Sequence, residues 1–253
     1  MKDFRLKDYM RLVNALQNAG MPVYTVAEWI KSRPTRGAVM RHDVDRRPGN
    51  AVRMAEAEHE AGITSTYYFR VVGSANNPDA MQKVAALGHE VGYHYEDLTL
   101  ARGNMRDALE LFGAHLKALR QIVPISTVVM HGSPLSPYNN LDMWQQGNLA
   151  DFDLLGDAFL SVDYSGTFYF TDTGRSWNSS TTNLRDRPPS AITAELSVSG
   201  TNALVDFIGS NKLLKVAFSV HPERWDATAA GWLSQHARDL LFNTAKRLIA
   251  LTR

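Results

Sequence analysis

The sequence has no cysteine, no excess of charge of either sign and no long apolar run, and each absence excludes a class of protein. Without cysteine, the 253-residue chain cannot form disulfides, a cysteine-ligated zinc or iron–sulfur site, or a thiol nucleophile. The 27 basic side chains nearly balance the 26 acidic ones, so nucleic acid is not an expected partner. No run of ~18 apolar residues is available to cross a membrane.

The remaining composition predicts an ordinary globular protein whose strong metal ligands are histidine, aspartate and glutamate. The first residues lack the basic and then apolar pattern of a secretory signal, which favours a soluble, cytoplasmic protein. At ~100–200 residues per domain, and with no linker composition along the chain, we expect a single domain.

Helical apolar spacing alternates along the chain with short runs of β-branched and aromatic residues. Helices are predicted at residues 6–19, 48–61, 78–87, 105–122, 201–208 and 231–251. Strands are predicted at residues 38–45, 63–72, 89–94, 126–130, 167–171 and 213–220. This alternation is typical of βα units and predicts an α/β barrel of parallel strands, complete or incomplete. Residues 1–37 form a helical lead-in, 38–225 the core and 226–253 a C-terminal helix.

Polar side chains collect where the predicted strands end. Six of them stand at or just after the carboxyl end of a strand: Asp43, Asp45, His94, His131, Asp172 and His221. Because the carboxyl ends of the strands of a parallel barrel share one rim, where active sites are built, we expect these groups to converge.

The segment 42–45, His-Asp-Val-Asp, is the sharpest local pattern. Alternation along a strand places Asp43 and Asp45 on one face and His42 on the other. Two adjacent carboxylates repel each other, which favours a cation beside them and predicts a metal site or an acid–base role. The alternative is a pair of surface acids in a turn near Arg46 and Arg47.

The histidines divide by position. His94 ends a strand and is followed by a polar cluster, and His131 opens a Gly-Ser-Pro turn directly after a strand. Both are therefore candidate ligands, with capping of backbone carbonyls as the alternative. His59, His115 and His236 lie on helical patterns and are expected to be structural.

Together these motifs resemble a known family. Residues 42–45, 88–94, 171–177 and 219–222 are similar, in order, to the motifs of polysaccharide deacetylases, the NodB-homology enzymes of carbohydrate esterase family four. The resemblance is closest to the branch with a His-Asp-Val-Asp first motif, found in bacterial surface-polysaccharide and O-antigen clusters. It spans about residues 38–225 and implies a distorted (β/α) barrel, usually of seven strands.

The resemblance also implies roles for individual residues. Asp43 matches the general base and Asp45 the metal ligand of the first motif. His94 matches the first histidine of the family's metal motif, and His221 the late histidine that acts as general acid. Two residues fall in the region whose acid and guanidinium groups orient catalytic side chains, Asp172 and Arg175.

The sequence departs from the family pattern at the second metal-binding histidine. Leu98 stands at that position, four residues after His94. We therefore expect His131 to supply the third ligand, with Asp97, His42 and His89 as alternatives. The family's arginine-containing third motif is likewise replaced by His-Gly-Ser-Pro at residues 131–134.

These residues lead to the hypothesis of a metal-dependent hydrolase that removes an acyl group, most simply acetyl, from an amino sugar that is free or linked to a nucleotide or lipid. Zinc is the expected ion, while cobalt, nickel and iron also suit such ligands. Four aromatic residues are expected to stack on the sugar: Tyr95, Tyr138, Trp177 and Trp225. The alternatives are a barrel hydrolase for cyclic amides or phosphoesters, and a catalytically silent sugar-binding barrel. The C-terminal helix is expected to pack an apolar stripe on the barrel or on a second subunit.

Overall fold

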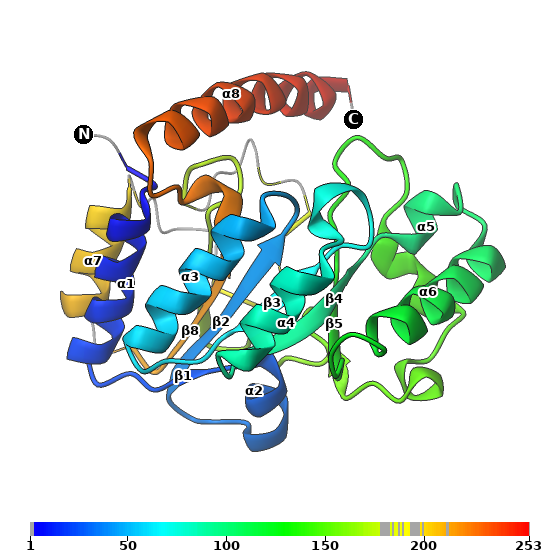
Figure 1. Ribbon diagram of the computed structural model, residues 1–253, viewed down its shortest axis with the longest axis horizontal. Coiled ribbons are helices and arrows are strands. Elements are labelled where there is room, and N and C mark those ends of the chain that lie inside the picture. Colours follow the sequence, from blue (N-terminus) through cyan, green and yellow to red (C-terminus); the bar gives the residue numbers. More distant parts are fainter. Residues whose placement is uncertain are drawn as a thin grey trace.

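A curved sheet of parallel strands forms the centre of the structure, a computed structural model (Figure 1). The structure describes residues 3–177, 183, 185, 186, 188, 190–192, 198, 200–210 and 213–252, with side chains of the last helix described to Thr244. The strands are β1 (Val23–Tyr24), β2 (Gly37–Val44), β3 (Thr66–Phe69), β4 (Glu90–Tyr95), β5 (Thr127–Met130), β6 (Gly156–Asp157), β7 (Thr167–Thr171) and β8 (Lys215–Val220).

The strand order is that of an incomplete barrel. The sheet runs β6-β5-β4-β3-β2-β8-β7, and β1 pairs with the start of β2. Strands β2 to β6 therefore follow each other in chain order, and β7 and β8 return to the other side of β2. In the described part of the chain β6 and β7 are not paired, so the barrel is open between them. The prediction of a single domain with a distorted (β/α)7-type barrel is confirmed.

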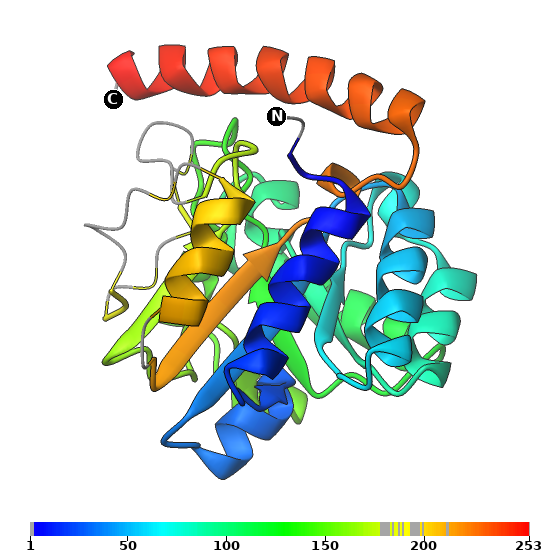
Figure 2. The ribbon, with the colours of Figure 1, turned by 90° about the vertical axis from the view of Figure 1, so that its left-hand side faces the viewer.

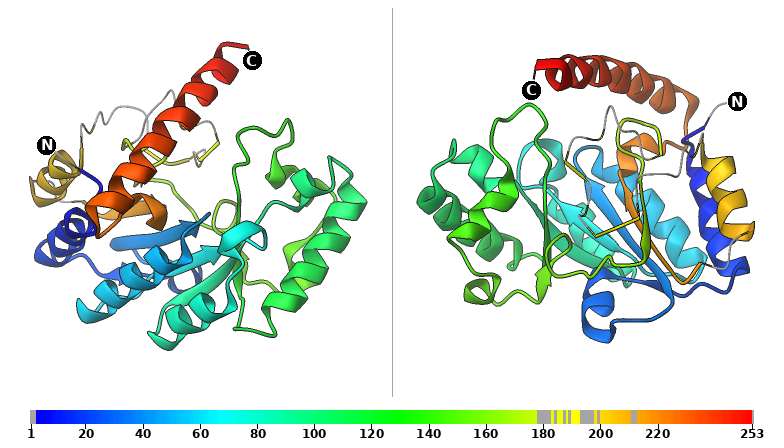
Figure 3. Two further views of the ribbon diagram at one scale, coloured as in Figure 1. Left: turned by 45° about the horizontal axis from the view of Figure 1, so that its top comes forward. Right: turned by 180° about the vertical axis from the view of Figure 1, so that it is seen from behind.

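Helices surround the sheet and one crosses its upper rim. Figures 1 and 2 show the first group packed around the outside of the strands. They are α1 (Leu6–Asn18), α2 (Val26–Ser32), α3 (Pro48–Glu60), α4 (Pro78–Ala86), α5 (Asp97–Leu100), α6 (Met105–Leu119) and α7 (Thr201–Ser210). Short 3-10 turns occupy Gly73–Ala75, Asn140–Gln145, Leu149–Phe152 and Pro222–Arg224. The last helix, α8 (Ala229–Thr252), crosses the carboxyl ends of the strands (Figures 2 and 3).

Local sequence signals account for most of these boundaries. Helix α3 begins with Pro48, whose fixed φ suits a first helical turn, and is followed by Gly62 at φ 72°. The lead-in additionally contains β1 and α2, which the sequence analysis missed. A capping box starts α2, since the Thr25 side chain accepts from the backbone of Glu28 and Glu28 accepts from that of Thr25. That signal was available in the sequence.

Helix α8 turns several of its apolar side chains away from the barrel. Leu233, Leu240 and Leu241 are exposed, with 62%, 56% and 75% of their surface accessible. The inward face instead buries Gln235 and Asp239 above the rim. These leucines therefore do not pack on the barrel, and the other half of the expectation, packing on a second subunit, stays a prediction. None of the described helices combines the length and apolar composition needed to span a membrane.

A buried polar cluster holds helices α1 and α3 to the outer face of β2. Glu58 on α3 accepts hydrogen bonds from the hydroxyls of Tyr9, Tyr67 (2.7 Å) and Ser65 (2.6 Å), and its Oε1 lies 2.8 Å from Nε2 of His42. Burial opposes ionisation, but the neighbouring imidazoles and hydroxyls outweigh it and lower the pKa of Glu58 to about 2. The cluster therefore fixes the strand that carries the first motif.

Replacing Glu58 by alanine should destabilise the fold strongly, because it leaves several buried donors without an acceptor. We expect Glu58→Ala to lower the free energy of unfolding by about 3 kcal/mol. The exposed Glu56→Ala on the same helix should change it by less than about 0.5 kcal/mol. Urea unfolding measures both.

The same pair of variants gives a pH dependence. A carboxylate whose folded-state pKa is lowered stabilises the protein above its usual pKa of 4.5 and loses that effect as the pH falls toward about 2. The loss in free energy of unfolding caused by Glu58→Ala should therefore become smaller as the pH falls over this range. An equal loss for Glu58→Ala and Glu56→Ala at pH 7 would show that the cluster does not stabilise the fold.

Candidate functional site

A cavity of about 360 Å³ opens at the carboxyl ends of the strands, beneath α8. Five of the six strand-end residues singled out in the sequence line it: Asp43, Asp45, His94, His131 and His221. They come from β2, β4, β5 and β8 and from the residues that follow these strands. The sixth, Asp172, contacts His221 from behind. The predicted convergence at one rim is confirmed.

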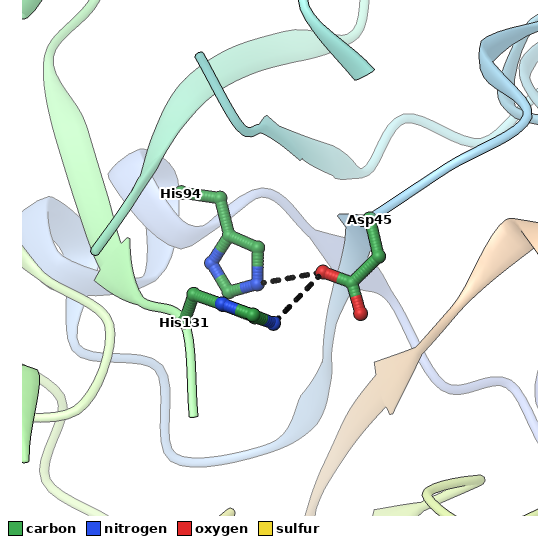
Figure 4. A group of neighbouring side chains, drawn as sticks. All are labelled: Asp45, His94 and His131. Atoms are coloured by element: carbon green, nitrogen blue, oxygen red, sulfur yellow. Dashed lines mark ion pairs between the residues drawn. The ribbon is translucent and has the colours of Figure 1, made fainter. Parts of the chain in front are cut away.

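Three of these side chains form a compact cluster (Figure 4). Oδ1 of Asp45 lies 3.4 Å from Nε2 of His94 and 3.5 Å from Nε2 of His131. One potential ligand atom from each residue lies within 4.8 Å of the others. The geometry thus brings together the three residues that the sequence suggested as metal ligands.

Each imidazole is oriented by a hydrogen bond at Nδ1, on the side of the ring away from Asp45. Nδ1 of His94 donates to the carbonyl oxygen of Val129 at 3.2 Å, and Nδ1 of His131 donates to Oε2 of Glu96 at 2.9 Å. Glu96 is itself held by Arg70, whose Nε lies 2.8 Å from Oε1. Burial opposes ionisation of Glu96, but the bond from His131 and the charge of Arg70 lower its pKa to about 2. A proton on each Nδ1 leaves the Nε2 lone pairs facing Asp45.

The cluster fits a divalent cation. Oδ1 of Asp45 is buried and makes no hydrogen bond in the described part of the chain. Burial lowers the pKa of His131, which favours the neutral imidazole that a metal requires. Burial opposes ionisation of Asp45 too, but His131 and His94 outweigh it and hold its pKa well below the usual range. Two imidazole nitrogens and one carboxylate oxygen match catalytic zinc sites, which keep a further position for water or substrate.

The three alternative ligands are engaged elsewhere. His42 and His89 belong to the cluster around Glu58, where His89 also bonds to the backbone of α3. Asp97 lies 2.7 Å from Nδ1 of His115. None of these three residues lines the cavity.

Asp43, near the end of β2, lines the same cavity as the cluster of Asp45, His94 and His131. Its Oδ2 accepts a hydrogen bond from Ser219 at 3.4 Å and lies 3.6 Å from the guanidinium of Arg41. Its Oδ1 is buried without a hydrogen-bond partner among the residues described. Arg41 is fixed by Asp186 at 2.7 Å. The carboxylate of Asp43 is therefore oriented through one oxygen, while the other is left to accept a proton.

His221 and Asp172 form a second oriented pair. Nδ1 of His221 donates to Oδ1 of Asp172 at 2.6 Å, and the backbone N–H of His221 donates to Oδ2 at 3.0 Å. Arg224 and Trp225 also donate to this carboxylate, at 2.9 and 2.7 Å. Burial raises the pKa of Asp172, but these neighbours outweigh it and lower the value to about 2. Burial and Arg224 oppose protonation of His221, yet Asp172 raises its pKa above the usual value.

Arg175 does not take the orienting role expected of it. Its guanidinium lies 3.3 Å from Oδ2 of Asp239 on α8 and stacks 4.7 Å from the ring centre of Trp232. The guanidinium that holds Asp172 is that of Arg224. The expectation for Arg175 is therefore wrong, and its side chain ties α8 to the rim.

The expectation of sugar stacking also fails for the four aromatic residues proposed for it. Tyr95, Trp177 and Trp225 are buried, and Tyr138 packs against Gly103. None of the four lines the cavity. Among the described residues, the phenyl rings that line it are those of Phe159 and Phe242.

Sequence reasoning missed three residues that support the site: Arg41, Glu96 and Asp186. Glu96 stands two residues after His94, so continued alternation would have placed it toward the same rim. Arg41 stands two residues before Asp43, so the same alternation would have placed it on the same face as Asp43. Asp186 lies in a segment without periodicity, and no sequence signal identifies it.

Comparisons with known proteins find a partial likeness to solved structures at low identity. No family model and no curated protein matches the sequence. The chain is similar to the solved structure of a CE4 esterase from Streptococcus mutans, with 14% identity, a TM-score of 0.46 and 91% of this chain and 90% of that chain covered. It is similar to a family 4 carbohydrate esterase from Bacillus anthracis, with 10% identity, a TM-score of 0.39 and coverage of 92% and 85%. At such identities, the chemistry must be judged from this chain's own side chains.

The bond from His131 to Glu96 should control metal affinity, because it sets the tautomer and orientation of the imidazole. We expect Glu96→Gln to weaken zinc binding by about 10–100-fold. The exposed Glu110→Gln should leave it unchanged. Competition with a chromophoric chelator measures both, and equal affinities would exclude the role given to Glu96.

Proposed function

We propose that this protein is a metal-dependent hydrolase that removes an acyl group, most simply acetyl, from the nitrogen of an amino sugar. One observation carries the proposal. A metal-type cluster of Asp45, His94 and His131 shares a cavity with a carboxylate and an imidazole, Asp43 and His221, which are held from behind. Amide hydrolysis needs these three elements: an electrophilic centre, a general base and a general acid.

A divalent cation held by the cluster would polarise the amide carbonyl and lower the pKa of water. Asp43 accepts the proton of the attacking water through Oδ1, the oxygen without a hydrogen bond. Ser219 and Arg41 hold its other oxygen, so that the carboxylate keeps its orientation as it takes the proton. Water thereby adds to the carbonyl carbon.

His221 completes the reaction on the leaving group. Its Nδ1–H is bound to Asp172, which leaves Nε2 to donate a proton to the amine as the carbon–nitrogen bond breaks. The raised pKa keeps a fraction of the imidazole protonated near neutrality. Arg224 keeps Asp172 ionised and in place throughout. The products are a carboxylate and a free amino sugar.

The finer features of the proposal have separate support. The nitrogen and oxygen ligands favour zinc, and cobalt, nickel and iron accept the same set. The cavity volume of about 360 Å³ suits a compact ligand such as one sugar with its acyl group. The ordered motifs support a role in bacterial surface polysaccharide, including the O-antigen of lipopolysaccharide.

The direct test is acetate release from N-acetylated amino sugars, free and linked to a nucleotide or lipid, by zinc-loaded protein. We expect release that is lost on chelation and restored by metal. Asp43→Asn should lower kcat by about 10²–10⁴-fold while zinc remains bound, because only the proton acceptor is removed.

Asp45→Ala should abolish both zinc binding and release, and the exposed Asp79→Asn should change neither. Formylated sugars, cyclic amides and phosphoesters belong in the same panel. Acetate release that survives both Asp43→Asn and Asp45→Ala would refute the assignment. Turnover of a phosphoester and of no acylated sugar would show that the reaction is phosphoester hydrolysis instead.

The pair of His221 and Asp172 predicts a shift in the pH profile. Activity requires protonated His221, so it should decline as the pH rises through the raised pKa of this group. Asp172→Asn removes the negative charge that raises this pKa and should move the alkaline limb of kcat/KM to lower pH. The exposed Asp206→Asn provides the control. An alkaline limb that stays in place would contradict the role of His221 as general acid.

A further inference from the structure

Arg46 is a cavity residue next in sequence to Asp45 of the proposed metal site. It follows Asp45 in the chain and lines the cavity under α8, where its guanidinium carbon lies 5.6 Å from the ring centre of Phe242. Its side chain is 26% exposed, so it is reachable from the cavity but partly removed from water. The guanidinium therefore lies in the cavity of the proposed reaction centre and contacts the helix that covers it.

The hydrogen-bonding state of Arg46 distinguishes it from the other arginines of the cavity, Arg41, Arg70, Arg185 and Arg224. Each of those donates to a carboxylate or to backbone carbonyls. Arg46 makes no hydrogen bond to any described residue, and its Nε is buried without a partner. A guanidinium has five N–H donors in a planar fork, which matches the oxygens of a carboxylate or phosphate.

The carboxylate of Glu223 lies beside Arg46 but does not satisfy it. Oε1 of Glu223 is 3.5 Å from Arg46, and neither oxygen of Glu223 makes a hydrogen bond in the described part of the chain. Glu223 is fully buried and does not line the cavity, so it approaches from behind. The face of the guanidinium toward the cavity stays available to a ligand.

The charges around the cavity add a second, independent argument. The described residues that line it include five arginines and five carboxylates, so their formal charges balance. A divalent cation at the cluster of Asp45, His94 and His131 gives this balanced lining a surplus of positive charge. A ligand with a negative group offsets that surplus, whereas a neutral sugar does not.

We propose that the amino sugar accepted by this cavity carries an anionic group, a carboxylate or a phosphate, and that Arg46 binds it. The inference rests on the proposed function for the acyl group, but anion recognition by Arg46 can be measured without turnover. It makes Arg46 a determinant of specificity rather than a catalytic residue. The two sources of the anion, a uronic acid and a sugar phosphate, share the same oxyanion chemistry and are separated by the probes.

The experiment measures binding of glucuronate, glucose 1-phosphate and glucose, none of which has an acyl group to lose, to zinc-loaded protein by calorimetry. At least one anion should bind wild type at least roughly tenfold more tightly than glucose, and Arg46→Gln should lose that preference. Arg46→Lys should retain part of it. Arg238→Gln is the matched control, because Arg238 stacks 5.8 Å from the same Phe242 ring without lining the cavity.

Each outcome decides the inference. No preference for either anion in wild type overturns it, and so does a preference that Arg46→Gln keeps, since the anion would then bind the metal or another arginine. The preferred anion identifies the source. The corresponding N-acetylated sugars then separate the two proposals: anion preference without acetate release contradicts the hydrolase alone, and equal release from neutral and anionic sugars contradicts Arg46 alone.

Discussion

The Nε2 atoms of His94 and His131 face one oxygen of Asp45 because the backbone and Glu96 hold both rings from behind. This arrangement depends on strand register. His94 pairs with Val129 across β4 and β5, and the same Val129 supplies the carbonyl that binds Nδ1 of His94. A one-residue slip of a strand would turn its side chains to the other face and disperse the cluster. The site is thus a consequence of the sheet, and the buried cluster at Glu58 secures its first strand.

Residues that follow β7 complete the same cavity. The segment after β7 contributes to this side of the cavity: Arg185 donates to the carbonyls of Gly132 and Tyr138 at 2.7 Å, and Asp186 binds Arg41. Helix α8 covers the rim with a polar inner face. A polar cover suits a polar ligand, while the reactive groups stay on or next to rigid strands.

Alternation and strand ends sufficed to predict the centre of the site, because Asp43, Asp45 and His94 follow directly from parallel strands that share a rim. Its periphery could not be predicted in this way. Arg175 adopts a left-handed turn with φ 59° and points to α8, whereas Arg224 follows β8 through a short 3-10 turn and reaches Asp172. Loop residues lack periodicity, so their direction depends on tertiary packing. For the same reason Trp225, which follows this turn, is buried. Tyr95 differs, because it ends β4 directly after His94, and alternation turns it to the opposite face, where it packs against Phe112.

The most direct test of the account is an anomalous difference map, at the zinc edge, from crystals grown with zinc and without chelator. We expect one peak at about 2.0–2.2 Å from the Asp45 carboxylate and from Nε2 of both His94 and His131. A peak bound by other residues, or no peak in zinc-saturated crystals, would contradict it.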